Sequence, residues 1–190
     1  MIFRLILSAL CVMVASAASA QEYLNQPSIR GFQYSLANDD RRNKTSVSGF
    51  GIGFFVPFGS GGVDFEIADT NNNNVGQAIT DVRYIAVLSQ GTSTAVEASL
   101  GALFVENNSG GTASVARDIV AGLSLELALG SSTLLALNAD YYDVENAGTL
   151  GGTFTQFFGG DTGFIIDATQ YTDWTGGDFA IIKTGLIFSF

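Results

Sequence analysis

The chain contains no histidine, one cysteine and two prolines in 190 residues. Near neutral pH a serine or water nucleophile needs a general base beside it, and the absence of histidine removes the commonest one. A pair of carboxylates could act instead, as in glycosidases, but no acidic pair stands out in the sequence. One cysteine allows neither an internal disulfide nor a thiolate metal site. We therefore predict that the protein is not an enzyme and uses no cofactor.

Positive charge is also scarce. Eight Lys and Arg residues stand against eighteen Asp and Glu residues, which gives a formal net charge of −10. Such a chain cannot offset the phosphate charge of a nucleic acid, so we expect no nucleic-acid partner. Yet 47% of the residues are hydrophobic and fifteen are Phe. The fold must place an unusual amount of apolar surface for so acidic a chain.

The first twenty residues have the order of a secretory signal peptide. Arg4 precedes an uncharged apolar run, and Ala18-Ser19-Ala20 closes it. The run is too short to span a membrane as a helix. Leu10 before Cys11 does not fit a lipidation signal. We predict that residues 1–20 are removed and that residues 21–190 form a single domain.

No stretch after residue 20 is typical of a transmembrane helix. The longest charge-free candidate, residues 45–63, contains six glycines and a proline, and its apolar residues recur at every second position. We expect Gly49, Gly51 and Gly53 to face a crowded interior beside Phe55. The same period of two predicts eight strands along the chain, at 28–37, 46–58, 63–69, 80–89, 94–105, 113–129, 133–144 and 179–190.

The connections between these strands alternate in length. Polar, asparagine-rich segments such as "NDDRRNK" and "TNNNNVGQ" alternate with short turns such as "GSGG". The stretch 113–129 carries an unbroken apolar face opposite Asp118 and Glu126, and eleven of its residues, tilted, would climb roughly 28 Å. In a soluble sandwich the charged face would be outside, and in a membrane barrel it would line the lumen. The alternation of loops favours the up-and-down barrel.

The last six residues are Gly185-Leu186-Ile187-Phe188-Ser189-Phe190. A terminal strand with glycine, an apolar residue and a final aromatic resembles the assembly signal of outer-membrane β-barrels, carried here by Gly185, Phe188 and Phe190. With its signal peptide and its strands, the chain resembles the small OmpA/OmpX-like barrels of Gram-negative bacteria, with no further domain. The resemblance implies a transmembrane antiparallel β-barrel in the cell outer membrane. It also implies the barrel-assembly machinery, outer-membrane lipid and lipopolysaccharide as partners.

Strand parity predicts which charges face the lumen. The inward set contains Arg83, Glu97, Glu126, Asp140 and Lys183, together with Asp64, Glu66, Asp81 and Asp118. Arg83 and Glu97 lie on neighbouring predicted strands above the same short turn and could meet, and Lys183 and Asp140 stand at similar heights on the last two predicted strands. Because eight strands leave room only for side chains, we predict an ion-pair network that plugs the lumen. The alternative is a narrow cation-preferring pore or small-solute transporter, since carboxylates outnumber basic groups.

The segment 146–177 is predicted to be a long extracellular segment, although it is rich in Phe, Ile, Tyr and Trp. It could form a hairpin above the membrane, a cover over the barrel mouth, or two further strands, which would give ten. From Asp118 to Ile182 the chain has no Lys or Arg, so divalent cations would have to bridge this surface to lipopolysaccharide phosphates. "DTNNNN" lacks the glycine and glutamate of a calcium loop, and we predict no metal there. The predicted role is structural or surface-interacting, through acidic loops that could bind an extracellular ligand.

Overall fold

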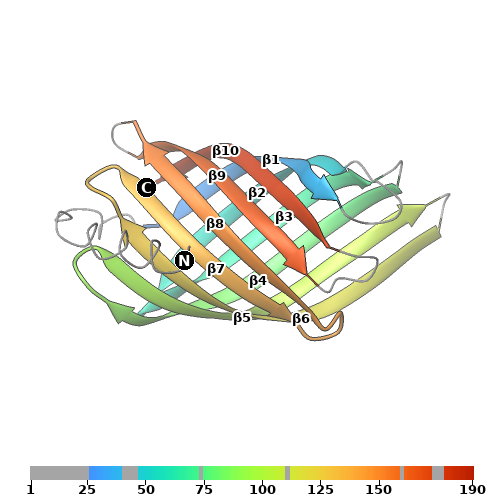
Figure 1. The fold of residues 1–190 in the computed structure, drawn as a ribbon, viewed down its shortest axis with the longest axis horizontal. Helices are drawn as coiled ribbons and strands as arrows, with labels where there is room; N and C mark the ends of the chain where they lie inside the picture. The colour runs from blue at the N-terminus through green and yellow to red at the C-terminus, as the bar shows by residue number, and fades with distance from the viewer. Residues whose placement is uncertain (1–25, 40–46, 73–74, 110–111, 159–160, 173–177) are drawn as a thin grey trace, which may run out of the picture.

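The computed structural model describes residues 26–39, 47–72, 75–109, 112–158, 161–172 and 178–190, so the predicted signal peptide lies outside the described residues. Ten antiparallel strands form a closed barrel (Figure 1). Their bounds are β1 Ser28–Asp39, β2 Val47–Phe58, β3 Gly61–Asn72, β4 Val75–Gln90, β5 Thr94–Ser109, β6 Thr112–Ala128, β7 Thr133–Tyr142, β8 Ala147–Phe157, β9 Thr162–Thr172 and β10 Phe179–Ser189. Each strand pairs with its neighbours in sequence, and β1 pairs with β10 to close the sheet.

The prediction of eight strands was wrong. The segment 146–177, predicted to lie outside the membrane, supplies β8 and β9, which are two full members of the barrel wall. Their period of two is weak in the sequence for a physical reason. Several inward positions are apolar, such as Phe157 and Ile165, while outward positions include Gly148 and Gly152. The usual contrast between an apolar outer face and a polar inner face is therefore lost.

The two ends of the barrel differ more in how far the strands continue than in the length of the connections between them. At one end, the short-turn end, the connections are residues 59–60, 91–93, 129–132 and 158–161. The strands β4, β5 and β6 have 16, 16 and 17 residues, against ten to twelve in the other strands. At the other end, the extended end, β5 and β6 stay paired as far as Ser109 and Thr112, beyond the last pair of β6 with β7 at Val120 and Tyr142. The yellow-green strands reach furthest at the right of Figure 1.

The segment "TNNNNVGQ", predicted as a long loop, is mostly part of these strands, and most of "NDDRRNK" lies outside the described residues. β3 runs to Asn72 and β4 begins at Val75, so only residues 73–74 connect them. A side-chain hydrogen bond also joins β4 and β5 there, in which Gln77 Nε2 donates to Asn107 Oδ1 at 2.6 Å. Strand pairing satisfies the backbone groups of these polar stretches, which gives them a regular structure despite their composition.

The outer surface is apolar. On β2, Phe50 and Phe58 are 72% and 74% exposed, and the other strands carry similar residues on the same face. The inner face holds a small buried cluster of Phe32, Tyr34, Ala68 and Ile165. Among the described residues, no helix is long and apolar enough to cross a membrane. An apolar exterior around a partly polar interior is the arrangement of a barrel whose outer solvent is lipid.

Candidate functional site: the barrel lumen

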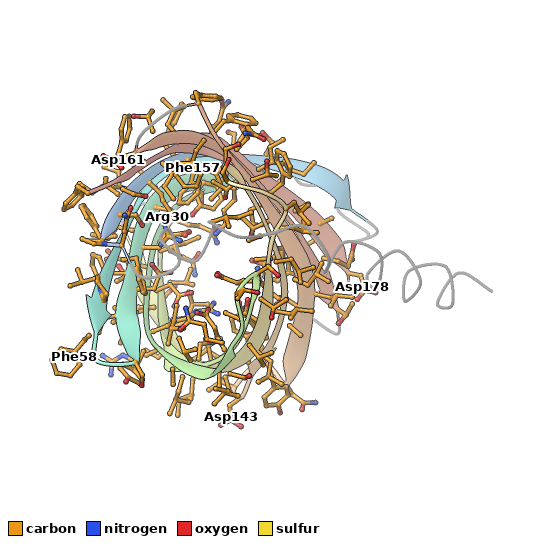
Figure 2. All side chains as sticks on the ribbon, turned by 90° about the vertical axis from the view of Figure 1, so that its left-hand side faces the viewer. Arg30, Phe58, Asp143, Phe157, Asp161 and Asp178 are labelled. Carbon is orange, nitrogen blue, oxygen red and sulfur yellow. The ribbon has the colours of Figure 1, made fainter. Side chains whose placement is uncertain are left out.

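The barrel encloses a cavity of about 490 Å³ to which all ten strands contribute side chains. Figure 2 looks along the barrel and shows side chains projecting inward from the wall, with Phe58 on the outside. Seven carboxylates and three basic groups line the cavity: Asp64, Glu66, Asp81, Glu97, Glu126, Asp140 and Asp167, with Arg30, Arg83 and Lys183. Seven minus three leaves a formal charge of −4 on the lining.

One set of charges joins β1, β3 and β10, and we call it the β1–β3–β10 cluster. Arg30 pairs with Asp64, and Tyr34 donates to Glu66. From β10, Lys183 Nζ donates to both Glu66 carboxylate oxygens, at 2.9 and 3.2 Å. The ammonium also lies 5.2 Å from the centre of the Tyr34 ring, within the range of a cation–π contact. The Glu66 carboxylate therefore has its hydrogen-bond donors and its counter-charge within the barrel wall.

Glycines of β2 make this cluster sterically possible. β2 lies between β1 and β3, so the long side chains of β1 must cross it to reach the carboxylates. A Cβ on Gly53 would lie 3.0 Å from Arg30 Nη2, and one on Gly51 would lie 2.9 Å from the Tyr34 ring. The alternating glycines therefore face the lumen, as expected from the sequence, and clear a path across their strand.

The second set of charges, the β4–β7 cluster, is centred on Arg83. Its guanidinium bonds to Asp81 on its own strand, at 2.7 Å from Nη2 to Oδ2, and to Asp140 on β7, at 2.9 Å from Nη1 to Oδ2. The second bond crosses β5 and β6, where Gly101 and Gly122 face the lumen. A Cβ on Gly101 would overlap the Val82 carbonyl and lie 2.8 Å from Arg83 Cγ, so the same device recurs here.

Neutral groups continue the network around the wall from β6 to β9. Ser124 donates to Asn138, Asn138 donates to Thr153 at 3.3 Å, and Thr153 donates to Asp167 at 2.8 Å. Thr169 also donates to Asp167, at 3.0 Å. Asp167 therefore accepts two hydroxyl hydrogen bonds, which lowers the cost of holding a carboxylate at the wall.

The predicted pairing of Arg83 with Glu97 was wrong. Register places Arg83 opposite Gly101 and Glu97 opposite Val87, four residues away along the ladder. An offset of four residues along a strand is roughly 13 Å, which is too far for a direct contact between the two side chains. Arg83 instead turns across the lumen to Asp140.

The predicted pairing of Lys183 with Asp140 was wrong as well. The prediction treated their strands as neighbours, but β8 and β9 lie between β7 and β10. The true neighbours of Lys183 in the ladders are Tyr34 and Asp167. Its ion-pair partner, Glu66, lies two strands beyond β1.

Two charged residues of the lumen were missed by sequence reasoning. Arg30 shares the inward parity of Phe32 and Tyr34, so the alternation of β1 could have found it. Asp167 belongs to β9, which was not predicted as a strand. Asp118 was expected in the lumen, and it is buried, but its carboxylate accepts from the backbone N–H groups of Val144 and Glu145. It therefore holds the β7–β8 turn.

Glu97 and Glu126 differ from the other lumen carboxylates. Both line the cavity near the short-turn end, on β5 and β6, and they are diagonal neighbours because Glu97 lies opposite Ser124. Glu97 is buried within the wall, at 9% exposed. Within the described part of the chain, neither carboxylate has a basic partner in an ion pair. They account for two of the four formal negative charges by which carboxylates exceed basic groups on the lining.

The residues of the predicted assembly signal lie at the seam between β10 and β1. Phe188 and Phe190 are 46% and 68% exposed on the outer surface, and the Phe190 N–H donates to the Pro27 carbonyl at 3.0 Å. Gly185 faces inward, and a Cβ there would overlap the Gly31 carbonyl. Recognition of this strand by the assembly machinery stays a prediction.

Solved structures with the same architecture are outer-membrane barrels. An outer membrane channel from Pseudomonas putida F1 is similar over 87% of this chain and 95% of its own, with a TM-score of 0.55 and 10% identity. A KdgM porin has a TM-score of 0.47 and 7% identity, over 86% of this chain and 99% of its own. The N-terminal barrel of Pseudomonas aeruginosa OprF has a TM-score of 0.42 and 13% identity, over 87% and 98%. No protein-family description and no curated protein matches the sequence.

The likeness to the Pseudomonas putida channel agrees with the barrel fold, and the apolar outer surface supports the outer membrane as the location. The predicted resemblance to outer-membrane barrels is confirmed at this level, with ten strands in place of eight. The chain is a closed ten-stranded antiparallel β-barrel, and it shares this fold with an outer membrane channel.

Proposed function

We propose that the protein is a narrow passive channel that prefers small cationic solutes. The observation that carries the proposal is the cavity of about 490 Å³ whose lining holds seven carboxylates and three basic groups. All three basic groups are engaged in ion pairs at the wall. A solute in the lumen would therefore meet negative charge without an accessible cation to repel it.

The position of the uncompensated charge supports the same direction of selectivity. Glu97 and Glu126 lie together near the short-turn end, where β5 and β6 approach their turns. Short turns are typical of the periplasmic side of outer-membrane barrels. We place the selectivity-determining carboxylates there, at the inner mouth of the channel.

Strand number also favours a channel over a plug. The plugged interior was predicted for eight strands, and barrel diameter grows with the number of strands. The charged clusters narrow the lumen, because their long side chains extend over the glycine positions of neighbouring strands and occupy part of its cross-section. The proposed conduit is therefore small, suited to ions and small solutes.

A second candidate is a closed barrel with a structural or surface-interaction role in the envelope. The Arg83–Asp140 ion pair favours it, because this bond crosses two intervening strands and ties distant parts of the wall together. In this proposal, acidic residues at the extended end would face lipopolysaccharide through bridging divalent cations, or an extracellular ligand. Barrel stability that is unchanged by chelation would count against the bridging.

Ion conductance across a planar bilayer decides between the two candidates. We expect discrete openings with a cation preference that falls several-fold in the double variant Glu97→Gln, Glu126→Gln. The matched control is Glu106→Gln, since Glu106 is an exposed glutamate of β5 on the outer face. Folded protein that never conducts would refute the channel and leave the closed barrel. If the cation preference of the openings were the same in the double variant, the proposed role of Glu97 and Glu126 would be refuted.

A further inference from the structure

One outward-facing residue does not suit the solvent around it. Gln33 lies in the middle of β1, five residues after Ser28 and six before Asp39. Its neighbours in sequence, Phe32 and Tyr34, are buried on the inner side, and Gln33 itself is exposed on the outer side. A mid-strand outward position is the depth at which a barrel meets the hydrocarbon of the membrane.

The outward residues next to Gln33 on its own strand are small, and larger apolar side chains lie beside them on β2 and β10. Gly31 and Ser35 flank it on the same face and are exposed, and a Cβ on Gly31 would meet no atom within 4 Å. Across the ladders, Gln33 lies opposite Thr184 of β10 and Phe50 of β2. We call this surface the β1 patch: Gly31, Gln33, Ser35 and Thr184. The corresponding mid-strand positions elsewhere carry residues such as Ile52, Leu100, Leu123 and Leu137.

Two other outward glutamines show how the chain otherwise handles this side chain. Gln156, near the end of β8, donates to the Ser132 carbonyl and the Phe157 carbonyl. Gln170, near the end of β9, donates to the Tyr171 carbonyl at 3.1 Å. Within the described residues, the Gln33 amide has no such hydrogen bond. An amide facing lipid without a partner is unfavourable, so an external partner is expected.

We infer that the β1 patch is the contact through which two copies of this chain associate in the membrane. An amide carries both a donor and an acceptor, so two Gln33 side chains related by a two-fold axis can form two reciprocal hydrogen bonds. An axis along the membrane normal keeps both copies in the same orientation, as insertion requires. Gly31 and Ser35 allow the two walls to approach closely, which suits association driven by packing inside lipid.

The uncharged character of the patch favours a second copy over a partner with a charged surface. The patch contains no Lys, Arg, Asp or Glu, and the apolar residues beside it, Ile29 and Ile52, are 37% and 51% exposed. A self-contact pairs this surface with an identical one, so each polar group finds its complement without a burial of charge. The association would place the two lumens side by side.

The test uses the full-length chain expressed in the outer membrane of a Gram-negative host, with Cys11→Ser so that an introduced thiol is unique. Ser35→Cys places a thiol beside Gln33 and leaves the amide intact. A short bifunctional maleimide should join two copies through this residue. The control is Leu123→Cys, since Leu123 is 59% exposed on β6, on the far side of the barrel. Equal cross-linking through both residues would overturn the inference.

A second measurement separates the amide from the surface. Native mass spectrometry of the protein released from lipid should show a dimer, and Gln33→Leu should weaken association about tenfold. Gln170→Leu, the same substitution where the amide is satisfied within the chain, should leave association unchanged. A monomer at every protein-to-lipid ratio, or cross-links from Ser35→Cys only to a different protein, would overturn the assignment of a second copy.

Discussion

Two acidic regions of the lumen wall are handled in opposite ways. In the β4–β7 cluster, Asp81 and Asp140 share one guanidinium, that of Arg83, at 2.7 and 2.9 Å. On β5 and β6, Glu97 and Glu126 lie near one another with no basic partner among the described residues. The first arrangement is what a stable wall requires, and the second lowers stability, as groups retained for function often do. The presence or absence of a basic partner, and not the number of carboxylates, therefore separates the two regions.

Removal of Arg83 should produce the largest effect. Arg83→Met leaves Asp81 and Asp140 as neighbouring carboxylates without their cation, and should lower the free energy of unfolding by about 3–5 kcal/mol. Urea unfolding in lipid vesicles, followed through the fluorescence of the single tryptophan, measures it. Arg117→Met is the matched control, because Arg117 is exposed on the same outer face of β6 as Ile119. Equal losses in both variants would show that the cluster has no special role.

The glycine that gives Arg83 its path should come next. Gly101→Ala adds a Cβ that overlaps the Val82 carbonyl and crowds Arg83, and should cost about 1–3 kcal/mol. Gly76→Ala is the same substitution at a glycine of β4 where an added Cβ meets no atom within 4 Å, and should be neutral or slightly stabilising. The comparison is of the two midpoints of urea unfolding. An equal shift of the midpoint in both variants would contradict the steric account.

The acidic pair should show the smallest effect on stability. Glu126→Gln removes one of two like charges and breaks no ion pair, so the free energy of unfolding should change by less than about 1 kcal/mol or rise. Glu66→Gln, which deprives Lys183 of its partner, should be clearly destabilising under the same conditions. If Glu126→Gln destabilised the barrel as much as Glu66→Gln, Glu126 would be part of the structural network and the contrast would fail.

Much of the barrel could be predicted because the period of two acts locally. Alternation along β2, β5 and β6 identified the strands and the face that meets lipid, and parity assigned Glu97, Glu126 and Lys183 to the lumen side. β8 and β9 were missed because glycines on the outer face and apolar residues on the inner face erase the alternation. The polar segment 70–77 was also mispredicted as a long loop, since its asparagine-rich composition did not prevent β3 from extending to Asn72.

The sequence by itself determined the class of fold, the apolar outer face and most of the inward charges, because each depends only on which way successive side chains point along a strand. The tertiary structure alone decided the partners. Lys183 pairs with Glu66, 117 residues away, and Arg83 pairs with Asp140 across two strands. Such contacts depend on the number of strands, on their register and on the glycines between them. Barrel closure sets the number of strands and their register, and so which glycines lie beneath which side chains, and no local period encodes it.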